Sequence, residues 1–238
     1  MSNDNLPCFH GRRAGRRLRI GQKALLETVL PQISLTLPAG TAPSSPARFF
    51  RSEYAAYWLE IGFGGGEHLA AQAAAHPDVG LIGAEPFING MVSLLRQVER
   101  RQLYNIRVLG DDVRPLLARL TPASLARVFI LFPDPWPKTR HHNRRLINAA
   151  NLDHLHRVLF AQGELRIASD HQGYIAWILR HVLDHGGFRW MAAQADDWRQ
   201  RPEDWPATRY EDKARAKGDA PVFLRFQKKP LVARAQTP

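Results

Sequence analysis

Acidic side chains end or follow three short apolar runs of this sequence, where they could bind a ligand. Glu60 lies just before a glycine-rich turn, Glu85 ends the next apolar run, and Asp111 and Asp112 follow the third. A carboxylate about 20 residues beyond such a turn is placed to accept hydrogen bonds from both hydroxyls of a ribose, and one of the two aspartates could bind an adenine amino group. A solvated loop carboxylate is the alternative for each acid taken alone. Acids at three successive run ends favour a site for a nucleoside.

The glycine-rich turn reads Glu60-Ile61-Gly62-Phe63-Gly64-Gly65-Gly66. Because glycines lack Cβ atoms, a ligand can approach the backbone N–H groups at the start of the following helix. The dinucleotide-binding fingerprint needs a further glycine where this chain has Glu67, which disfavours a nicotinamide dehydrogenase. The glycines could also serve the backbone conformation alone. We expect Gly62, Gly64 and Gly66 to adjoin the nucleoside.

The segment Phe132-Pro133-Asp134-Pro135-Trp136-Pro137-Lys138 is the most specific in the chain. Its three alternating prolines fix φ and remove backbone donors, which predicts a rigid, extended loop. A rigid loop suits catalysis by positioning, and its carboxylate could stabilise positive charge on a substrate. We therefore expect Asp134 to be catalytic. Trp136 could stack on a base or pack in the core.

A basic run follows this loop at once: Lys138-Thr139-Arg140-His141-His142-Asn143-Arg144-Arg145. Permanent positive charges without acids among them suit contact with nucleic-acid phosphates, although a charge run is also typical of a solvated helix face. His154 and His156 lie two apart in a helical stretch and so point to different faces, which argues against chelation. We expect the basic run to contact phosphates, and we expect no metal site.

Two further polar segments could hold a substrate. Ser169-Asp170 ends an apolar run and could bind the Watson–Crick donors of a guanine, or could cap the next helix. Thr208-Arg209-Tyr210-Glu211 places a hydroxyl and a carboxylate three residues apart, which a helix capping box also explains. The residues alone leave both interpretations open.

The composition favours a polyanionic partner. Lys and Arg number 33 against 22 Asp and Glu, a net charge of +11 that suits phosphate neutralisation, with solubility as the plainer explanation. A single cysteine, Cys8, fits a reducing cytosol and no disulfide framework. No apolar run approaches the roughly 20 residues of a membrane span. We expect a cytoplasmic protein, with an Arg-rich organellar transit peptide as the alternative.

The elements that must position these residues alternate between strand and helix from residue 57 onward. The predicted strands are 57–61, 80–84, 106–109, 127–132 and 164–169. A late strand is predicted over 222–227, at the edge of the sheet. The predicted helices are 67–75, 89–101, 113–120, 144–159 and 172–184. This order predicts an α/β, Rossmann-like, doubly wound and mostly parallel sheet, with the acids along its carboxyl edge.

The chain divides by composition into three parts. Residues 1–50 hold a basic arm that we expect to be mobile without a partner, a short helix over 22–30 stopped by Pro31, and a linker over 37–46. Residues 51–230 form the expected catalytic domain, and residues 231–238 form a tail.

Taken together, these segments resemble the bacterial tRNA (guanine-N7-)-methyltransferases of the TrmB family. The resemblance spans most of the chain from about residue 10, in the family's order. The matching segments are 59–66, Gly83-Ala84-Glu85, 132–138, Ala168-Ser169-Asp170 and 208–211. It implies a class I methyltransferase fold, S-adenosylmethionine as donor, and N7 methylation of the guanosine at position 46 of the tRNA variable loop.

The resemblance also implies roles for single residues. The donor site would be lined by Glu60, Glu85, Asp112 and Asp134, the choice of Asp112 over Asp111 resting on the resemblance alone. The substrate would be held by Lys138, Asp170, Thr208, Arg209, Tyr210 and Glu211. RNA would be touched by Arg140, His141, His142, Asn143, Arg144 and Arg145. Pro137 and His171 depart from residues common in the family, and neither is assigned a role.

Two other functions compete with N7 methylation. Methylation of an exocyclic amine is the closer chemical rival, because acid–proline loops after a fourth strand also serve that reaction. A non-catalytic RNA-binding protein that keeps the fold is the second, and the retained Glu60, Glu85 and Asp134 speak against it. The sequence leaves monomer and homodimer open.

Overall fold

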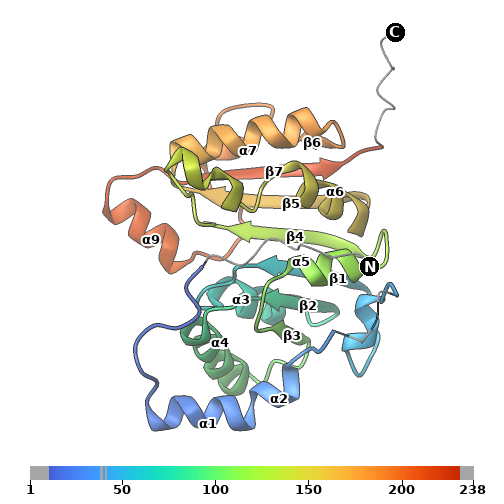
Figure 1. The fold of residues 1–238 in the computed structure, drawn as a ribbon, viewed down its shortest axis with the longest axis vertical. Helices are drawn as coiled ribbons and strands as arrows, with labels where there is room; N and C mark the ends of the chain where they lie inside the picture. Colours follow the sequence, from blue (N-terminus) through green and yellow to red (C-terminus); the bar gives the residue numbers. More distant parts are fainter. Residues whose placement is uncertain (1–10, 38–39, 41, 231–238) are drawn as a thin grey trace.

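The computed structural model of the protein describes residues 11–37, 40 and 42–230 (Figure 1). In this part of the chain, seven strands form one sheet in the order β3-β2-β1-β4-β5-β7-β6. The strands are β1 Ala56–Ile61, β2 Val79–Ala84, β3 Ile106–Leu109, β4 Leu125–Leu131, β5 Leu159–Ser169, β6 Phe188–Trp190 and β7 Val222–Lys228. The first five run parallel, and β7 is antiparallel to both β5 and β6. The predicted α/β, doubly wound, mostly parallel fold is confirmed.

The helices connect successive strands and extend the chain at both ends. Within the described residues they are α1 Ile20–Thr28, α2 Leu30–Ile33, α3 Glu67–Ala75, α4 Ile88–Arg101, α5 Arg114–Arg119, α6 Ala149–Val158, α7 Gln172–His185, α8 Asp196–Arg199 and α9 Arg209–Ala216. Two 3-10 turns are η1 Pro46–Phe49 and η2 Thr139–Arg144. The strand order reverses between β1 and β4, the switch point at which ligands bind in such sheets.

Helices cover both faces of the sheet because alternate strand residues are buried on opposite sides (Figure 1). In β4, Val128 and Ile130 pack in a hydrophobic cluster with residues of α5, α6 and α7. Phe129 and Leu131 pack in a second cluster with residues of α1, α3 and α4. Burial on both faces is typical of parallel strands and fixes where their carboxyl ends lie.

The helix predicted over residues 144–159 begins only at Ala149. Asn148 caps it, because its side-chain oxygen accepts a hydrogen bond from the backbone N–H of Asn151 at 3.0 Å. The preceding residues form η2 and then an extended stretch at Arg145. The predicted start of this helix was therefore too early by roughly one and a half helical turns.

Pro31 does not end the first helix as predicted. It lies in the first turn of α2, which begins at Leu30, where a missing backbone N–H costs nothing. α1 ends earlier, at Thr28, and both short helices contribute residues to the second hydrophobic cluster. The domain boundary placed at residue 50 stays a prediction.

The late strand is present as β7, but the expectation of an edge position was wrong. β7 lies between β5 and β6, and β6 forms the border of the sheet. With only three residues, β6 is too short to show the alternation that predicts strands. Cys8 and the expected tail lie outside the described residues.

Candidate active site

A cavity of about 600 Å³ opens at the carboxyl ends of the parallel strands. Its volume is in the range of small-molecule sites. It is lined by eleven of the residues singled out from the sequence: Gly62, Gly64, Glu85, Asp111, Asp112, Asp134, Trp136, Asn143, Arg144, Arg145 and Tyr210. Segments far apart in the chain therefore meet at this edge.

Glu85 joins the end of β2 to the glycine-rich turn. Its carboxylate accepts hydrogen bonds from the backbone N–H groups of Gly64 at 2.7 Å and Phe87 at 2.9 Å. A carboxylate offers about four acceptor positions, so it can still bind two ribose hydroxyls. Burial raises the pKa of Glu85. The two hydrogen bonds lower it, and the negative charges of Asp134 and Glu60 raise it. Three of the predicted acids therefore lie close enough to interact.

Glu60 itself lies behind the turn and is buried. Its Oε2 is 2.8 Å from Nδ1 of His68 on α3, and it is not among the residues that line the cavity. Gly66 is also absent from the lining, and a Cβ there would come within 2.7 Å of Leu94. The glycine at 66 is thus required by the packing of α3 against α4.

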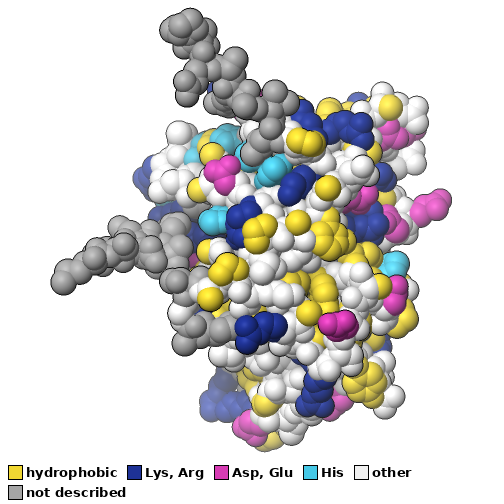
Figure 2. All heavy atoms as spheres, turned by 90° about the vertical axis from the view of Figure 1, so that its right-hand side faces the viewer, with side chains coloured by type: hydrophobic (Ala, Val, Ile, Leu, Met, Phe, Trp, Pro, Cys, Tyr) yellow, Lys and Arg dark blue, Asp and Glu magenta, His cyan; other side chains and the backbone are white. Residues whose placement is uncertain are grey.

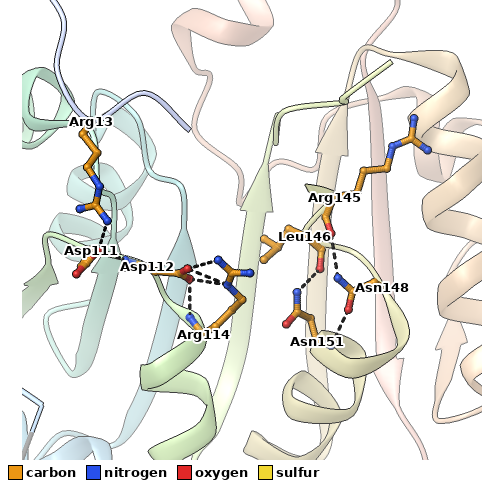
Figure 3. Close-up of polar contacts among 8 residues, drawn as sticks. All are labelled: Arg13, Asp111, Asp112, Arg114, Arg145, Leu146, Asn148 and Asn151. Carbon is orange, nitrogen blue, oxygen red and sulfur yellow. Dashed lines mark hydrogen bonds and ion pairs between the residues drawn. The ribbon is translucent and has the colours of Figure 1, made fainter. Parts of the chain in front are cut away.

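Asp111 and Asp112 form the wall of the cavity that follows β3 (Figure 3). Arg114 holds both carboxylate oxygens of Asp112, with its Nε at 2.9 and 2.8 Å from them. Asp111 accepts a hydrogen bond from Arg13 at 2.9 Å, and its side chain is 59% exposed against 18% for Asp112. The N–H of Asp112 lowers the pKa of Asp111, and Arg13 adds to that effect. Asp112 is the better placed of the two for a ligand inside the cavity.

The proline loop crosses the cavity after β4. Asp134 is exposed at the cavity, and the residues two positions before and after it, Phe132 and Trp136, have positive φ values of 52° and 41°. Non-glycine residues in this left-handed region cost of order 1–3 kcal/mol and persist only where the surroundings hold them. Trp136 is half-buried, with the Arg144 guanidinium 5.0 Å from its ring. The loop that carries Asp134 is therefore strained and restrained.

The basic run divides into four groups. Lys138 and Arg140 are exposed outside the cavity lining, whereas Asn143 and Arg144 line it. His141 and His142 are half-buried against Trp136 and Trp177, respectively. Arg145 was expected to contact RNA, but its side chain is buried and donates to backbone carbonyls of the proline loop.

The segment from Thr208 to Glu211 begins α9. Thr208 Oγ1 accepts a hydrogen bond from the backbone N–H of Glu211 at 3.2 Å, the capping contact that its spacing allowed. The buried Glu211 carboxylate pairs with Arg201 at 3.1 Å and Arg215 at 2.9 Å. Of this segment only Tyr210 lines the cavity, and Arg209 pairs with Glu67 at 3.5 Å.

Asp170 is half-buried at the end of β5 and outside the cavity lining. The cap of α7 comes from its neighbour His171, whose Nδ1 accepts a hydrogen bond from the backbone N–H of Tyr174 at 3.2 Å. This contact gives His171 a structural role that its sequence position left open.

Sequence reasoning missed Arg114, Asn148 and Asn151, all of which line the cavity. Figure 3 shows the two asparagines on the wall opposite Asp112, ahead of and within α6. The preference of asparagine for helix N-caps is the signal that could have found this wall.

The segment before α1 is attached to the cavity wall, although the sequence predicted a mobile arm. The carbonyl of Arg13 accepts a hydrogen bond from the N–H of Ile88 at 2.9 Å. Asn89 Oδ1 accepts from the N–H of Gly15 at 2.7 Å, and Asn89 Nδ2 donates to the carbonyl of Arg16 at 2.8 Å. Gly11 and Arg12 line the cavity. In Figure 1 this blue segment climbs from α1 along α4.

Comparison with known proteins gives a consistent assignment. A family model described as "Putative methyltransferase" matches residues 55–224. A tRNA (guanine-N(7)-)-methyltransferase of Rhodospirillum rubrum is 50% identical over 228 residues, covering 94% of this chain and 89% of the relative. One of Paramagnetospirillum magneticum is 50% identical over 224 residues, covering 94% and 93%. This chain belongs to the tRNA (guanine-N7-)-methyltransferase family.

Solved structures add support for the methyltransferase fold alone. TrmN from Thermus thermophilus has a TM-score of 0.53 at 15% identity, covering 87% of this chain and 48% of that one. A precorrin-6y C5,15-methyltransferase from Geobacter metallireducens has a TM-score of 0.50 at 13% identity, covering 76% and 84%. The Rossmann-like, class I assignment is therefore confirmed.

Methyltransferases of this family use S-adenosylmethionine, and the cavity fits that donor. Gly62 and Gly64 have positive φ values of 73° and 55°, a conformation that glycine adopts without strain. Glu85 offers acceptors for ribose hydroxyls, and Asp112 offers one for an amino group. The lining holds four carboxylates, Glu85, Asp111, Asp112 and Asp134, beside four arginines.

The described residues contain neither a cluster of metal ligands nor a membrane-spanning helix. Among residues 11–37, 40 and 42–230, no group of three or more His, Cys, Asp or Glu side chains is arranged to hold a metal ion. No helix in this same part of the chain is long and apolar enough to cross a membrane.

Proposed function

We propose that this protein transfers a methyl group from S-adenosylmethionine to N7 of a guanine in tRNA, the guanosine at position 46 of the variable loop. The observation that carries the proposal is the meeting of Glu85, the glycine-rich turn and Asp134 in one cavity. The names and high identity of the relatives supply the substrate class. A cytoplasmic location follows as part of the same proposal.

Methylation of guanine N7 requires little proton transfer by the protein. When bound, S-adenosylmethionine supplies an electrophilic methyl group. Guanine N7 already presents a lone pair, so no base is needed at that atom, but its alkylation leaves a cationic ring. Asp134 stabilises that positive charge from a fixed loop, and the remaining contribution is proximity and orientation.

The tRNA backbone is held by the basic run beside the cavity. Exposed Lys138 and Arg140 bind phosphates, and Arg144 does so at the cavity itself. Figure 2 shows the opposite face of the molecule, where Lys and Arg are scattered and Asp and Glu lie among them. Such a mixed face suits solvent better than a phosphate backbone.

Incubation of the protein with an unmodified tRNA transcript and labelled donor tests this function. Nucleoside analysis is expected to find 7-methylguanosine, and a transcript with adenosine at position 46 is expected to stay unlabelled. If the label is found on an exocyclic amine, the protein catalyses that rival methylation and not methylation of N7. An RNA-binding protein without activity would release no heat with S-adenosylmethionine in calorimetry, whereas the enzyme does.

A further inference from the structure

The carbonyl groups of the proline loop need donors from elsewhere in the chain. Pro133, Pro135 and Pro137 have no N–H group, so the loop cannot pair its own carbonyls in a regular ladder. Arg145 supplies the donors: its Nε lies 2.8 Å from the carbonyl oxygen of Pro135 and its Nη2 lies 3.4 Å from that of Trp136. Both carbonyls follow Asp134 directly in the chain.

Arg145 is itself held on several sides. Its guanidinium lies 5.1 Å from the ring of Tyr174 and 4.6 Å from that of Trp177, both on α7. Its backbone N–H donates to the carbonyl of His142, and its carbonyl accepts from Asn148. Burial raises the pKa of Tyr174 to about 12, so this ring faces the cation as a neutral phenol. The side chain thus links the loop to a helix of the core.

The location of Arg145 separates it from its neighbours in the basic run. Only 4% of the residue is exposed, whereas Arg140 is exposed and Arg144 is partly so. Figure 3 shows its side chain directed away from the Asp112–Arg114 wall of the cavity. A planar guanidinium with several donors can hold two carbonyls and stack on rings at once, which a lysine ammonium cannot.

We propose that Arg145 is a positioning residue that fixes the Asp134 loop, and that it is not an RNA contact. The strained φ values at Phe132 and Trp136 require such a restraint. The inference rests on the proposed function, because its consequence is measured in the methylation rate. A loop that is free to relax holds the Asp134 carboxylate away from its working position, which slows the chemical step.

The test compares Arg145→Lys and Arg145→Ala with the wild type in single-turnover methylation of tRNA at saturating donor and tRNA. Both variants are expected to lose about 10- to 100-fold in rate, since a displacement of about 1 Å can cost that much. Donor and tRNA affinities are expected to stay within about threefold. Added guanidinium ion at low millimolar concentration is expected to restore part of the Arg145→Ala rate. Arg189→Ala, an exposed arginine on β6, is the matched control.

Hydrogen exchange of the peptide over residues 130–140 shows whether the loop itself is loosened. Faster exchange at Asp134 and Trp136 in Arg145→Lys, with thermal unfolding near that of the wild type, supports the proposal. A wild-type rate in Arg145→Lys and Arg145→Ala overturns it. Lost tRNA affinity with an unchanged single-turnover rate also overturns it, because that is the signature of a phosphate contact. A wild type that makes no methylated tRNA would instead refute the proposed function.

Discussion

Asp134 and Glu85 are both carboxylates of one cavity, but their surroundings differ. Asp134 is exposed on a strained loop, whereas Glu85 is buried and holds two backbone N–H groups. Burial disfavours the charged form of a carboxylate, and it raises the pKa of Glu85. Asp134 suits interaction with developing positive charge, and Glu85 suits fixed hydrogen bonds to a ligand.

Replacing Asp134 with alanine is expected to abolish turnover while leaving folding and most tRNA affinity intact. The exposed side chain contributes little to the core, and loss of a charge used in the transition state costs at least about 100-fold in rate. Single-turnover methylation, thermal unfolding and filter binding to tRNA measure the three quantities. Asp78→Ala, an exposed aspartate before β2, serves as control. A wild-type rate in Asp134→Ala would refute the assigned role.

Donor binding is expected to weaken as the pH falls, because burial raises the pKa of Glu85 above its ordinary value of 4.5. The ionised carboxylate accepts ribose hydroxyls, and protonation removes part of that capacity. Calorimetry across the acidic range checks this, with Glu85→Gln expected to bind weakly and with less pH dependence. Equal pH dependence in the variant would assign the effect to another group.

The same raised pKa has an opposite effect on folding. The folded chain binds the Glu85 proton more tightly than the unfolded chain does. Its contribution to the free energy of unfolding is therefore fully present below pH 4.5 and is lost as the pH rises through the folded-state pKa. An ionised Glu85 therefore serves donor binding but lowers the free energy of unfolding.

At the scale of the elements, α4 presses against the glycine-rich turn. A Cβ on Gly90 would lie 2.1 Å from the carbonyl oxygen of Gly64, so Gly90→Ala must displace the turn. We expect a loss of about 1–3 kcal/mol in the free energy of unfolding, together with weaker donor binding. Thermal unfolding with and without S-adenosylmethionine measures both.

Gly21 offers the matched control for that prediction, because a Cβ there meets nothing within 4 Å in α1. Gly21→Ala is expected to stabilise the protein by about 0.5–1 kcal/mol without affecting donor binding. Equal effects of the two substitutions would mean that helix propensity, and not the contact with Gly64, determines the result.

The elements that are best predicted from the sequence are those whose ends are marked by nearby residues. α3 and β3 begin and end at the predicted residues, because a glycine turn and clear apolar runs define them. Parallel strands share a carboxyl edge, so the meeting of Glu85 and Asp134 could also be predicted.

The remaining features depend on contacts between distant segments. Arg145 looks like its basic neighbours in sequence, and only the packing of α7 buries it. The residues from Gly11 to Arg16 show no periodicity, and their attachment depends on Asn89, more than 70 residues away. The partner of Glu60 is on α3, but no sequence rule identifies His68.

For the whole molecule, the net charge of +11 predicts strongly salt-dependent tRNA binding. Deletion of residues 1–19 removes five arginines and is expected to weaken tRNA binding and flatten its salt dependence. Because Gly11 and Arg12 line the cavity, donor affinity is expected to fall as well. Filter binding at several salt concentrations and donor calorimetry check the two effects. An unchanged salt slope would count against phosphate contact by this segment.

The seating of residues 11–16 beside α4 also bears on how the protein is best produced. A purification tag fused directly ahead of Gly11 is tethered next to the donor cavity, where its own charges and bulk compete for space. β7 runs antiparallel to β5, so it ends at the edge of the sheet where the parallel strands begin, away from the cavity at their carboxyl ends. Groups for immobilisation or fluorescent labelling are therefore better attached directly after Pro230, which follows β7.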